Sequence, residues 1–228
     1  MNIFTLLLAV DLCFAASTLF RGGTIIAFDE ASESLRIIRD GSLLVTDDRV
    51  TALYEPSEVP STSNSTVVDV TGKIITPGFI DTHRHGWQTS FKTLASNITL
   101  WDYFERFSEF AAASLLSAED VYLSQIAGLY EALNAGVTTS LDHAHHTWSN
   151  ETAIAGLQGS IDSGARVFWA YAFHNVTNYT TPEQFANFRD IANEAVFKGT
   201  STSLGIACDF FGPEPIPDQV QSVVDLAL

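Results

Sequence analysis

The sequence is poor in cysteine and in positive charge, and after its first residues it has no long apolar run. Two cysteines in 228 residues exclude a disulfide scaffold and a four-cysteine zinc site. Eleven Lys and Arg against 27 Asp and Glu give a net charge of −16. We expect no nucleic-acid partner, because no cationic surface is available to displace phosphate counterions. No later stretch of 18 uncharged apolar residues occurs, which excludes a multi-span membrane protein.

The rest of the composition is that of a chain with a hydrophobic core. Apolar residues make up 46% of the sequence and charged residues 17%, which excludes wholesale disorder. The acidic balance bears on solubility and on partners rather than on the fold.

The first residues have the pattern of a secretory signal peptide. Apolar residues dominate from Ile3 to Phe14, and small residues follow at positions 15–17, as in the apolar and cleavage regions of such peptides. No Lys or Arg precedes the apolar run, and Asp11 interrupts it, so an ordinary first strand or helix is the alternative. We predict that residues 1–16 are a signal peptide and that the protein is secreted.

Potential N-glycosylation sites favour the same prediction. The N-x-[ST] motif marks such an acceptor, and this composition would give about two by chance. The sequence has five, at Asn64, Asn97, Asn150, Asn175 and Asn178. We therefore predict an extracellular glycoprotein.

Residues 17–75 have the pattern of a small β-domain. Short apolar runs alternate with turn residues such as Asp29-Glu30, Asp40-Gly41 and Asp47-Asp48, which is typical of strands joined by turns. Residues 55–66 are rich in Pro and Ser and are expected to form a surface loop. Because Thr71-Gly72 separates two further runs, we expect a hairpin over residues 67–75.

From residue 76 onward, strand patterns alternate with helix patterns. We expect strands over residues 78–82, 137–141, 166–173 and 203–208. Helices are expected after the Ser117–Asp120 capping box, over residues 150–163, from an N-cap at Thr181, and from Pro217. The first of these helices should present one apolar face made of Leu123, Ile126, Ala127, Tyr130 and Leu133.

This alternation predicts an α/β domain with a parallel sheet. A closed barrel of eight βα units takes about 250 residues, so the 153 residues from 76 to 228 suffice for four or five units. The domain is therefore either an open four-stranded sheet or half a barrel.

The run TPGFIDTHRH, residues 76–85, ends the first of these strands. Side chains two apart in a strand point to the same side, so His83 and His85 are expected to project together from its carboxyl end. Two imidazoles so placed can hold one divalent metal through ring nitrogens at about 2.0–2.1 Å.

Four stretches together resemble the amidohydrolase superfamily, in particular its metal-dependent deaminases and chlorohydrolase-like enzymes. They are LFRGGT at residues 19–24, the run at 76–85 with Gln88, AGVTT at 135–139, and Asp142-His143. The PGFIDTHxH part is highly specific, and the GVTT part is moderately so.

The resemblance implies a TIM barrel beside a small β-sandwich made from both chain ends. Residues 17–75 would be the N-terminal part of that sandwich, and residues 76–228 would be the first half of the barrel, about four of eight units. It also implies a divalent metal, zinc or iron, held by His83 and His85. The metal would activate water for attack on a non-peptide C–N or C–halogen carbon of a small molecule. Gln88 and Trp87 would line the substrate pocket.

The sequence departs from the family pattern after the fourth strand. The remaining family ligands, histidines on strands 5 and 6 and an aspartate on strand 8, have no counterpart in the 228 residues. Two histidines alone hold zinc weakly and without the geometry that activates water, so we expect a truncated and inactive chain whose catalytic residues are unknown. The half barrel would expose two sheet edges and self-associate through them.

Two other functions are compatible with the sequence. One is a secreted, non-catalytic half-domain that binds a metal, a small molecule or a second copy of itself. The other is an open α/β binding module without metal. In the latter case, replacing His83 and His85 by Ala would change no ligand affinity.

A second histidine cluster, DHAHH at residues 142–146, ends the second strand. Either it is a polar loop whose histidines bond to the backbone, or His143 and His145 contact substrate; metal binding is the less favoured interpretation. His174, at the end of the third strand, is a weaker candidate of the same kind. The end of the fourth strand is where some family members have a metal-bridging ligand. Cys208, Asp209 and Glu214 lie there, but none of them matches a pattern.

Overall fold

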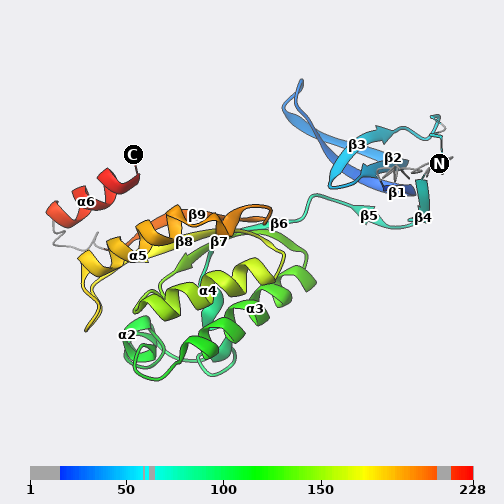
Figure 1. Ribbon diagram of the computed structural model, residues 1–228. Helices are drawn as coiled ribbons and strands as arrows, with labels where there is room; N and C mark the ends of the chain where they lie inside the picture. Colours follow the sequence, from blue (N-terminus) through cyan, green and yellow to red (C-terminus); the bar gives the residue numbers. More distant parts are fainter. Residues whose placement is uncertain (1–15, 59, 62–64, 210–216, 228) are drawn as a thin grey trace, which may run out of the picture. The chain divides into compact units, whose positions relative to one another are not determined.

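The computed structural model describes residues 16–58, 60–61, 65–209 and 217–227. The chain divides into two compact units, Met1–Pro77 and Gly78–Leu228, and each is described by itself (Figure 1). Three of the predicted features lie outside the described residues: the apolar run of the signal peptide, Asn64 and Glu214.

The first unit is built on one five-stranded sheet. Strand β1 (Ser17–Asp29) pairs antiparallel with β2 (Ser34–Thr46), which pairs antiparallel with β3 (Arg49–Tyr54). Strands β4 (Ser65–Asp69) and β5 (Ile74–Ile75) pair parallel with β1, one after the other. Its core is a cluster around Ile25, Ile38 and Leu43.

Two of the turns expected in this unit are wrong. The segment around Thr71-Gly72 is not a hairpin, because β4 and β5 both follow β1 in the same direction. Asp40-Gly41 does not separate two strands but lies inside β2, where the pairing with β1 shifts register. The Asp47-Asp48 turn is confirmed, since Thr46 pairs with Arg49 across it.

The second unit is an α/β domain with a parallel sheet, as predicted. Its four strands are β6 (Phe79–Arg84), β7 (Val137–Ala144), β8 (Arg166–Phe173) and β9 (Thr202–Cys208), and they pair in that order, all parallel. The segments between them contain η1 (Gly86–Phe91), α1 (Leu100–Arg106), α2 (Glu109–Ala112), α3 (Ala118–Asn134), α4 (Asn150–Asp162), α5 (Thr181–Asn193) and η2 (Ala195–Phe197). Helix α6 (Pro217–Ala227) comes last.

Helix starts follow the sequence closely. The Ser117–Asp120 capping box is present at the start of α3. Helix α5 begins one residue earlier than expected, because Thr180 rather than Thr181 is the N-cap and Glu183 completes the capping box.

The apolar face predicted for α3 is wrong. Leu123, Tyr130 and Leu133 are exposed, whereas the buried side of the helix carries Val121, Ser124, Gln125, Gly128, Leu129 and Ala132. This side packs against η1 and α4, and polar Gln125 is fully buried in it because its amide bonds to Asp142 and Ser160. Hydrophobic periodicity misses a face that is buried through polar groups and glycine.

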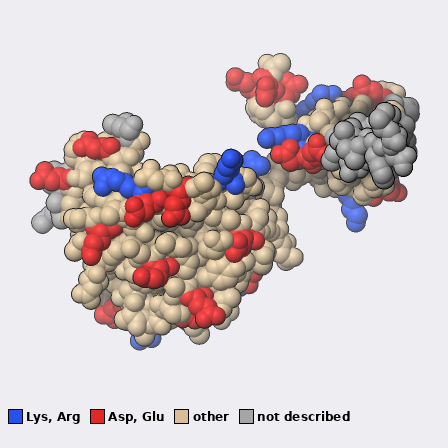
Figure 2. All heavy atoms as spheres, in the orientation of Figure 1, with Lys and Arg blue, Asp and Glu red and all other residues tan. Residues whose placement is uncertain are grey.

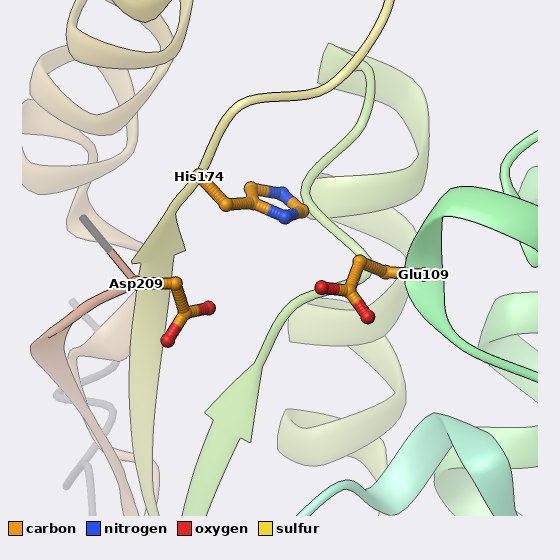
Figure 3. A group of neighbouring side chains, drawn as sticks. All are labelled: Glu109, His174 and Asp209. Carbon is orange, nitrogen blue, oxygen red and sulfur yellow. The ribbon is translucent and has the colours of Figure 1, made fainter. Parts of the chain in front are cut away.

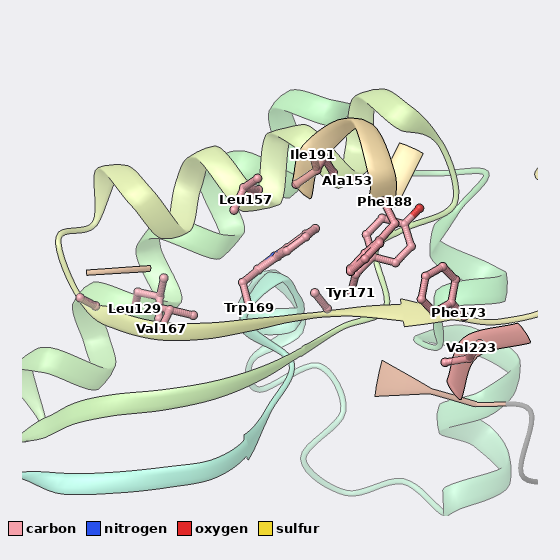
Figure 4. Close-up of a cluster of buried hydrophobic side chains, with 12 residues drawn as sticks. Leu129, Ala153, Leu157, Val167, Trp169, Tyr171, Phe173, Phe188, Ile191 and Val223 are labelled. Atoms are coloured by element: carbon pink, nitrogen blue, oxygen red, sulfur yellow. The ribbon is translucent and has the colours of Figure 1, made fainter. Parts of the chain in front are cut away.

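The main core lies between β8 and the helices that cover it (Figure 4). Trp169, Tyr171 and Phe173 of β8 are fully buried, and as alternate residues of a strand they point to the same face. They cluster with apolar residues of α4 and α5, including Leu157, Phe188 and Ile191. This core makes β8 and its carboxyl end a rigid support.

The surface agrees with the acidic composition. Acidic side chains outnumber basic ones on the face of the second unit seen in Figure 2. Among the described residues, no helix combines the length and the apolar character needed to cross a bilayer.

Candidate metal centre

A depression lies where the carboxyl ends of β6, β7 and β9 meet. Parallel strands end at the same edge of a sheet, which is where α/β folds place their ligands. The depression has a volume of about 400 Å³ and is lined by His83, His85, Tyr103, Phe104, Glu109, Phe110, His143, His145 and Asp209. Histidines from two strand ends and two carboxylates therefore share one site.

His83 and His85 face each other at this depression. His83 lies in β6 and His85 follows the strand directly. Their Nε2 atoms are 3.2 Å apart, and their rings meet edge to face with centroids 4.8 Å apart. Nδ1 of His85 lies 2.9 Å from the carbonyl oxygen of His143. Because a carbonyl only accepts, Nδ1 carries the proton and Nε2 keeps its lone pair.

This geometry fits a divalent metal. Two nitrogens bound to one tetrahedral zinc ion at about 2.0–2.1 Å lie about 3.3 Å apart, close to the 3.2 Å observed. Ligating histidines are usually oriented by a hydrogen bond from the other ring nitrogen, as His85 is here. Burial lowers the pKa of His85 to about 4, so the ring is neutral at pH 7, as a metal ligand must be.

Asp142 fixes the chain directly after His85. One carboxylate oxygen accepts from the backbone N–H of Gly86 at 3.0 Å, and the other accepts from the Gln125 amide at 2.6 Å. A Cβ atom on Gly86 would lie 2.5 Å from the Gln125 side chain, so this close approach requires glycine. Asp142 is fully buried and holds the His85–Gly86 segment in place without lining the depression.

His143 and His145 both line the depression. Nε2 of His143 lies 3.0 Å from Oδ2 of Asp209. Burial lowers the pKa of His143, but the hydrogen bond and charge of Asp209 more than offset this, so the pKa lies above its usual value. Nδ1 of His145 accepts the indole N–H of Trp87 at 3.0 Å, and burial holds the pKa of His145 well below its usual value.

The other two residues predicted to contact substrate do not line this depression. Trp87 is completely buried and belongs to a small core cluster with Ala112, Val121 and Trp148. Gln88 donates to Tyr103 and to the carbonyl of Phe107 and lines a neighbouring cavity of about 270 Å³. Both residues therefore act on the site through a hydrogen bond to a lining residue: Trp87 positions His145, and Gln88 positions Tyr103.

The structure brings a residue that the sequence did not mark, Glu109, into the site. Atoms of Glu109, His174 and Asp209 that could bind a metal lie within 4.8 Å of one another, and Figure 3 shows the three side chains converging. His174 and Asp209 follow β8 and β9 directly, and this position at strand ends could have paired them. Glu109 lies in the long segment between β6 and β7, where no pattern in the sequence indicates it.

The four predicted glycosylation acceptors that the structure describes lie on the surface. Of those within the described residues, Asn97, Asn150, Asn175 and Asn178 are all exposed. Asn150 accepts a hydrogen bond from Tyr179, so its side chain is less accessible than its exposure indicates.

Comparison with known proteins extends these observations. The model of the amidohydrolase family matches residues 74–227. A 5'-deoxyadenosine deaminase of Methanosarcina barkeri is 30% identical over 136 residues, 58% of this chain and 30% of the relative. A 5-methylthioadenosine/S-adenosylhomocysteine deaminase of Caldicellulosiruptor saccharolyticus is 26% identical over 201 residues, 87% of this chain and 42% of the relative.

Solved structures share the fold. A guanine deaminase from C. acetobutylicum superposes with a TM-score of 0.73 at 18% identity, over 92% of this chain and 51% of that one. A triazine hydrolase variant superposes with a TM-score of 0.74 at 16% identity, over 93% of this chain and 50% of that one. This chain thus spans less than half the length of the two curated relatives and about half that of the two solved proteins.

Proposed function

This chain belongs to the amidohydrolase family, and from that membership we propose that it serves metal-dependent hydrolysis of a non-peptide C–N bond in a small molecule. One observation carries the proposal: the Nε2 atoms of His83 and His85 lie 3.2 Å apart at the depression. The deaminases among its relatives support the choice of a C–N bond.

The proposed metal is zinc or iron(II), held by His83 and His85. Such a metal lowers the pKa of water and so supplies a hydroxide near neutral pH. The chain itself keeps the two imidazole nitrogens in position. The carbonyl of His143 orients His85, and Asp142 secures Gly86 behind it. His143 and His145, on the same wall, are proposed to contact the substrate.

We propose a purine or purine nucleoside as the substrate class. The curated relatives are named for adenosine derivatives, and one structural neighbour is named for guanine. Tyr103, Phe104 and Phe110 line the depression, and aromatic rings of this kind stack on planar heterocycles.

The four βα units are proposed to be half of a family barrel, with residues 17–75 as part of the accompanying β-sandwich. In the described sheet β6 pairs only with β7, and β9 only with β8. The further ligands implied by the resemblance belong to strands 5, 6 and 8, beyond these four. We therefore expect the 228 residues alone to bind metal weakly, to associate through the two sheet edges, and to show no turnover.

Metal loading and ligand binding test this proposal. Protein loaded with zinc or iron(II) is mixed with 5'-deoxyadenosine, methylthioadenosine or guanine, and ammonia release and quenching of tryptophan fluorescence are measured. We expect saturable quenching that requires metal and is lost in His83→Ala/His85→Ala, without ammonia. Ammonia release would contradict the inactivity of this chain. Absence of any purine binding would remove the purine substrate class and leave the non-catalytic metal-binding half-domain.

Secretion is the localisation that we propose. The excess of acceptor motifs and the exposure of Asn97, Asn150, Asn175 and Asn178 support it. Expression in a secreting eukaryotic cell, followed by digestion with an N-glycosidase, tests it: a drop in apparent mass supports secretion, and an unmodified intracellular product contradicts it.

A further inference from the structure

Glu109, His174 and Asp209 come from three separate segments and meet at one side of the depression, which Glu109 and Asp209 line. Their candidate ligand atoms all lie within 4.8 Å of one another. Figure 3 shows a ring nitrogen of His174 directed between the two carboxylates. None of the three belongs to the pair formed by His83 and His85, so the cluster has to be explained separately.

The hydrogen bonds around His174 determine which nitrogen carries its proton. The Thr147 hydroxyl donates its one proton to the carbonyl of Ala172 at 2.7 Å. Nε2 of His174 lies 3.1 Å from that hydroxyl oxygen and 3.3 Å from the Thr147 carbonyl oxygen. Both oxygens can then only accept, so Nε2 carries the hydrogen and Nδ1 keeps a lone pair.

That lone pair is buried and has no partner. His174 is 1% exposed, and Nδ1 makes no hydrogen bond within the described residues. Burial lowers the pKa of His174 to about 4, so the imidazole is neutral at pH 7. An unpaired buried acceptor is destabilising, and a ligand on Nδ1 would remove that penalty.

The backbone of His174 is held as firmly as its ring. The buried Gln184 side chain accepts from the His174 N–H at 3.1 Å and donates to the His174 carbonyl at 2.7 Å. With Thr147 on Nε2, this fixes the direction of Nδ1. Rigid support of this kind around a ligand residue is typical of metal sites.

Neither carboxylate has a Lys or Arg partner among the described residues; Asp209 is exposed and pairs with His143, and Glu109 is buried. Glu109 is 8% exposed, and burial, together with the charge of Asp209, raises its pKa. A buried carboxylate is stabilised by pairing with a cation.

We propose that Glu109, His174 and Asp209 form a second cation site, separate from His83 and His85, that binds a divalent transition metal such as zinc or manganese. The imidazole favours a transition metal over magnesium or calcium, and the carboxylates suit zinc and manganese. Asp209 can bind the ion through one oxygen while the other accepts from His143, since a carboxylate accepts through both. The proposal does not depend on the hydrolytic function.

Cobalt(II) titration of the full chain tests the site, because cobalt replaces zinc in such sites and its visible absorption reports the ligands. The wild type is expected to bind two ions, His83→Ala/His85→Ala one, and that double variant with Glu109→Gln or Asp209→Asn none at the same concentration. We expect each added substitution to weaken the remaining site at least tenfold. Manganese binding, followed by electron paramagnetic resonance, should show the same loss.

Matched controls remove one negative charge from an exposed helix nearby. Glu105→Gln on α1 and Asp190→Asn on α5, both exposed, are expected to leave cobalt binding unchanged in the double variant. The proposal is overturned if the double variant binds no cobalt, or if it binds cobalt equally well with and without Glu109→Gln and Asp209→Asn. Loss of purine binding alone would leave it intact.

Discussion

The ends of β6 and β7 carry the same short motif, two histidines separated by one residue, and the structure uses the two motifs differently. His83 and His85 have ring centroids 4.8 Å apart, with Nε2 atoms 3.2 Å from each other. His143 and His145 have ring centroids 5.6 Å apart. Nε2 of His143 pairs with Asp209, and Nδ1 of His145 accepts from Trp87.

The difference shows that neighbouring groups, more than spacing, decide what such a motif does. After β6, the proton of His85 is directed to a backbone carbonyl, and both Nε2 atoms remain toward the depression. After β7, a carboxylate and an indole N–H occupy the nitrogens, and the next residue, His146, is buried with Nδ1 on the Thr152 carbonyl. Of the two pairs, the first has the nitrogen separation that two ligands of one metal require.

Removal of one histidine from each motif tests this comparison most directly. In a Glu109→Gln background, which removes the proposed second site, His83→Ala is expected to lower zinc affinity by about 100-fold or more, since a direct ligand is lost. His145→Ala should lower it by less than the roughly 10–100-fold typical of residues that hydrogen-bond to metal ligands, because in the described part of the chain His145 contacts the His85 ring but makes no hydrogen bond to His83 or His85. Isothermal titration calorimetry gives both values, and equal losses would remove the distinction.

Crowding around His146 gives the next largest effect. A Cβ atom on Gly156 of α4 would lie 2.1 Å from Cε1 of His146. Gly156→Ala should therefore lower the free energy of unfolding by about 1–3 kcal/mol, because overpacking outweighs the gain in helix propensity. Urea denaturation measures it, with the half-exposed Ile154→Ala in the same helix as the control. An unchanged midpoint for Gly156→Ala would show that His146 can move, contrary to a purely structural role.

The sequence predicts well the parts of the site that lie next to strand ends. His83, His85, His143 and His145 fall there, and a parallel sheet necessarily brings such positions together. The starts of α3 and α4 follow from local signals, such as the capping box at Ser117.

What the sequence misses depends on contacts between distant segments. Trp87 is buried because α3 and the Trp148 segment cover it, and no pattern near residue 87 shows this. Glu109 enters the site only through the path of the long segment after β6. The buried face of α3 depends on Gln125 reaching Asp142, a polar contact that hydrophobic periodicity does not register.

The hydrogen bond from Trp87 to His145 of the second motif gives a smaller, sharper test. Trp87→Phe keeps the ring packing but removes the N–H that donates to His145, leaving a buried acceptor unpaired. We expect a loss of about 1–2 kcal/mol in the free energy of unfolding. Trp148→Phe, in the same cluster, is the control for loss of ring size. If both variants lose the same amount, packing rather than the hydrogen bond holds His145.

The last test is a pH dependence that separates His146 from the His83–His85 motif. Burial lowers the pKa of His146 to about 3, against about 6.5 in an unfolded chain. Between these values the unfolded state binds one more proton than the folded state. The contribution of neutral His146 to the free energy of unfolding is therefore fully present above about pH 6.5 and is lost as the pH falls toward 3. His146→Gln should therefore reduce the slope of unfolding free energy between pH 6 and 4 by about 1 kcal/mol per pH unit. Ile154→Ala changes no titrating group, so it should keep the wild-type slope of unfolding free energy against pH even if its denaturation midpoint shifts. If His146→Gln has the same slope as Ile154→Ala, His146 is protonated in the folded state.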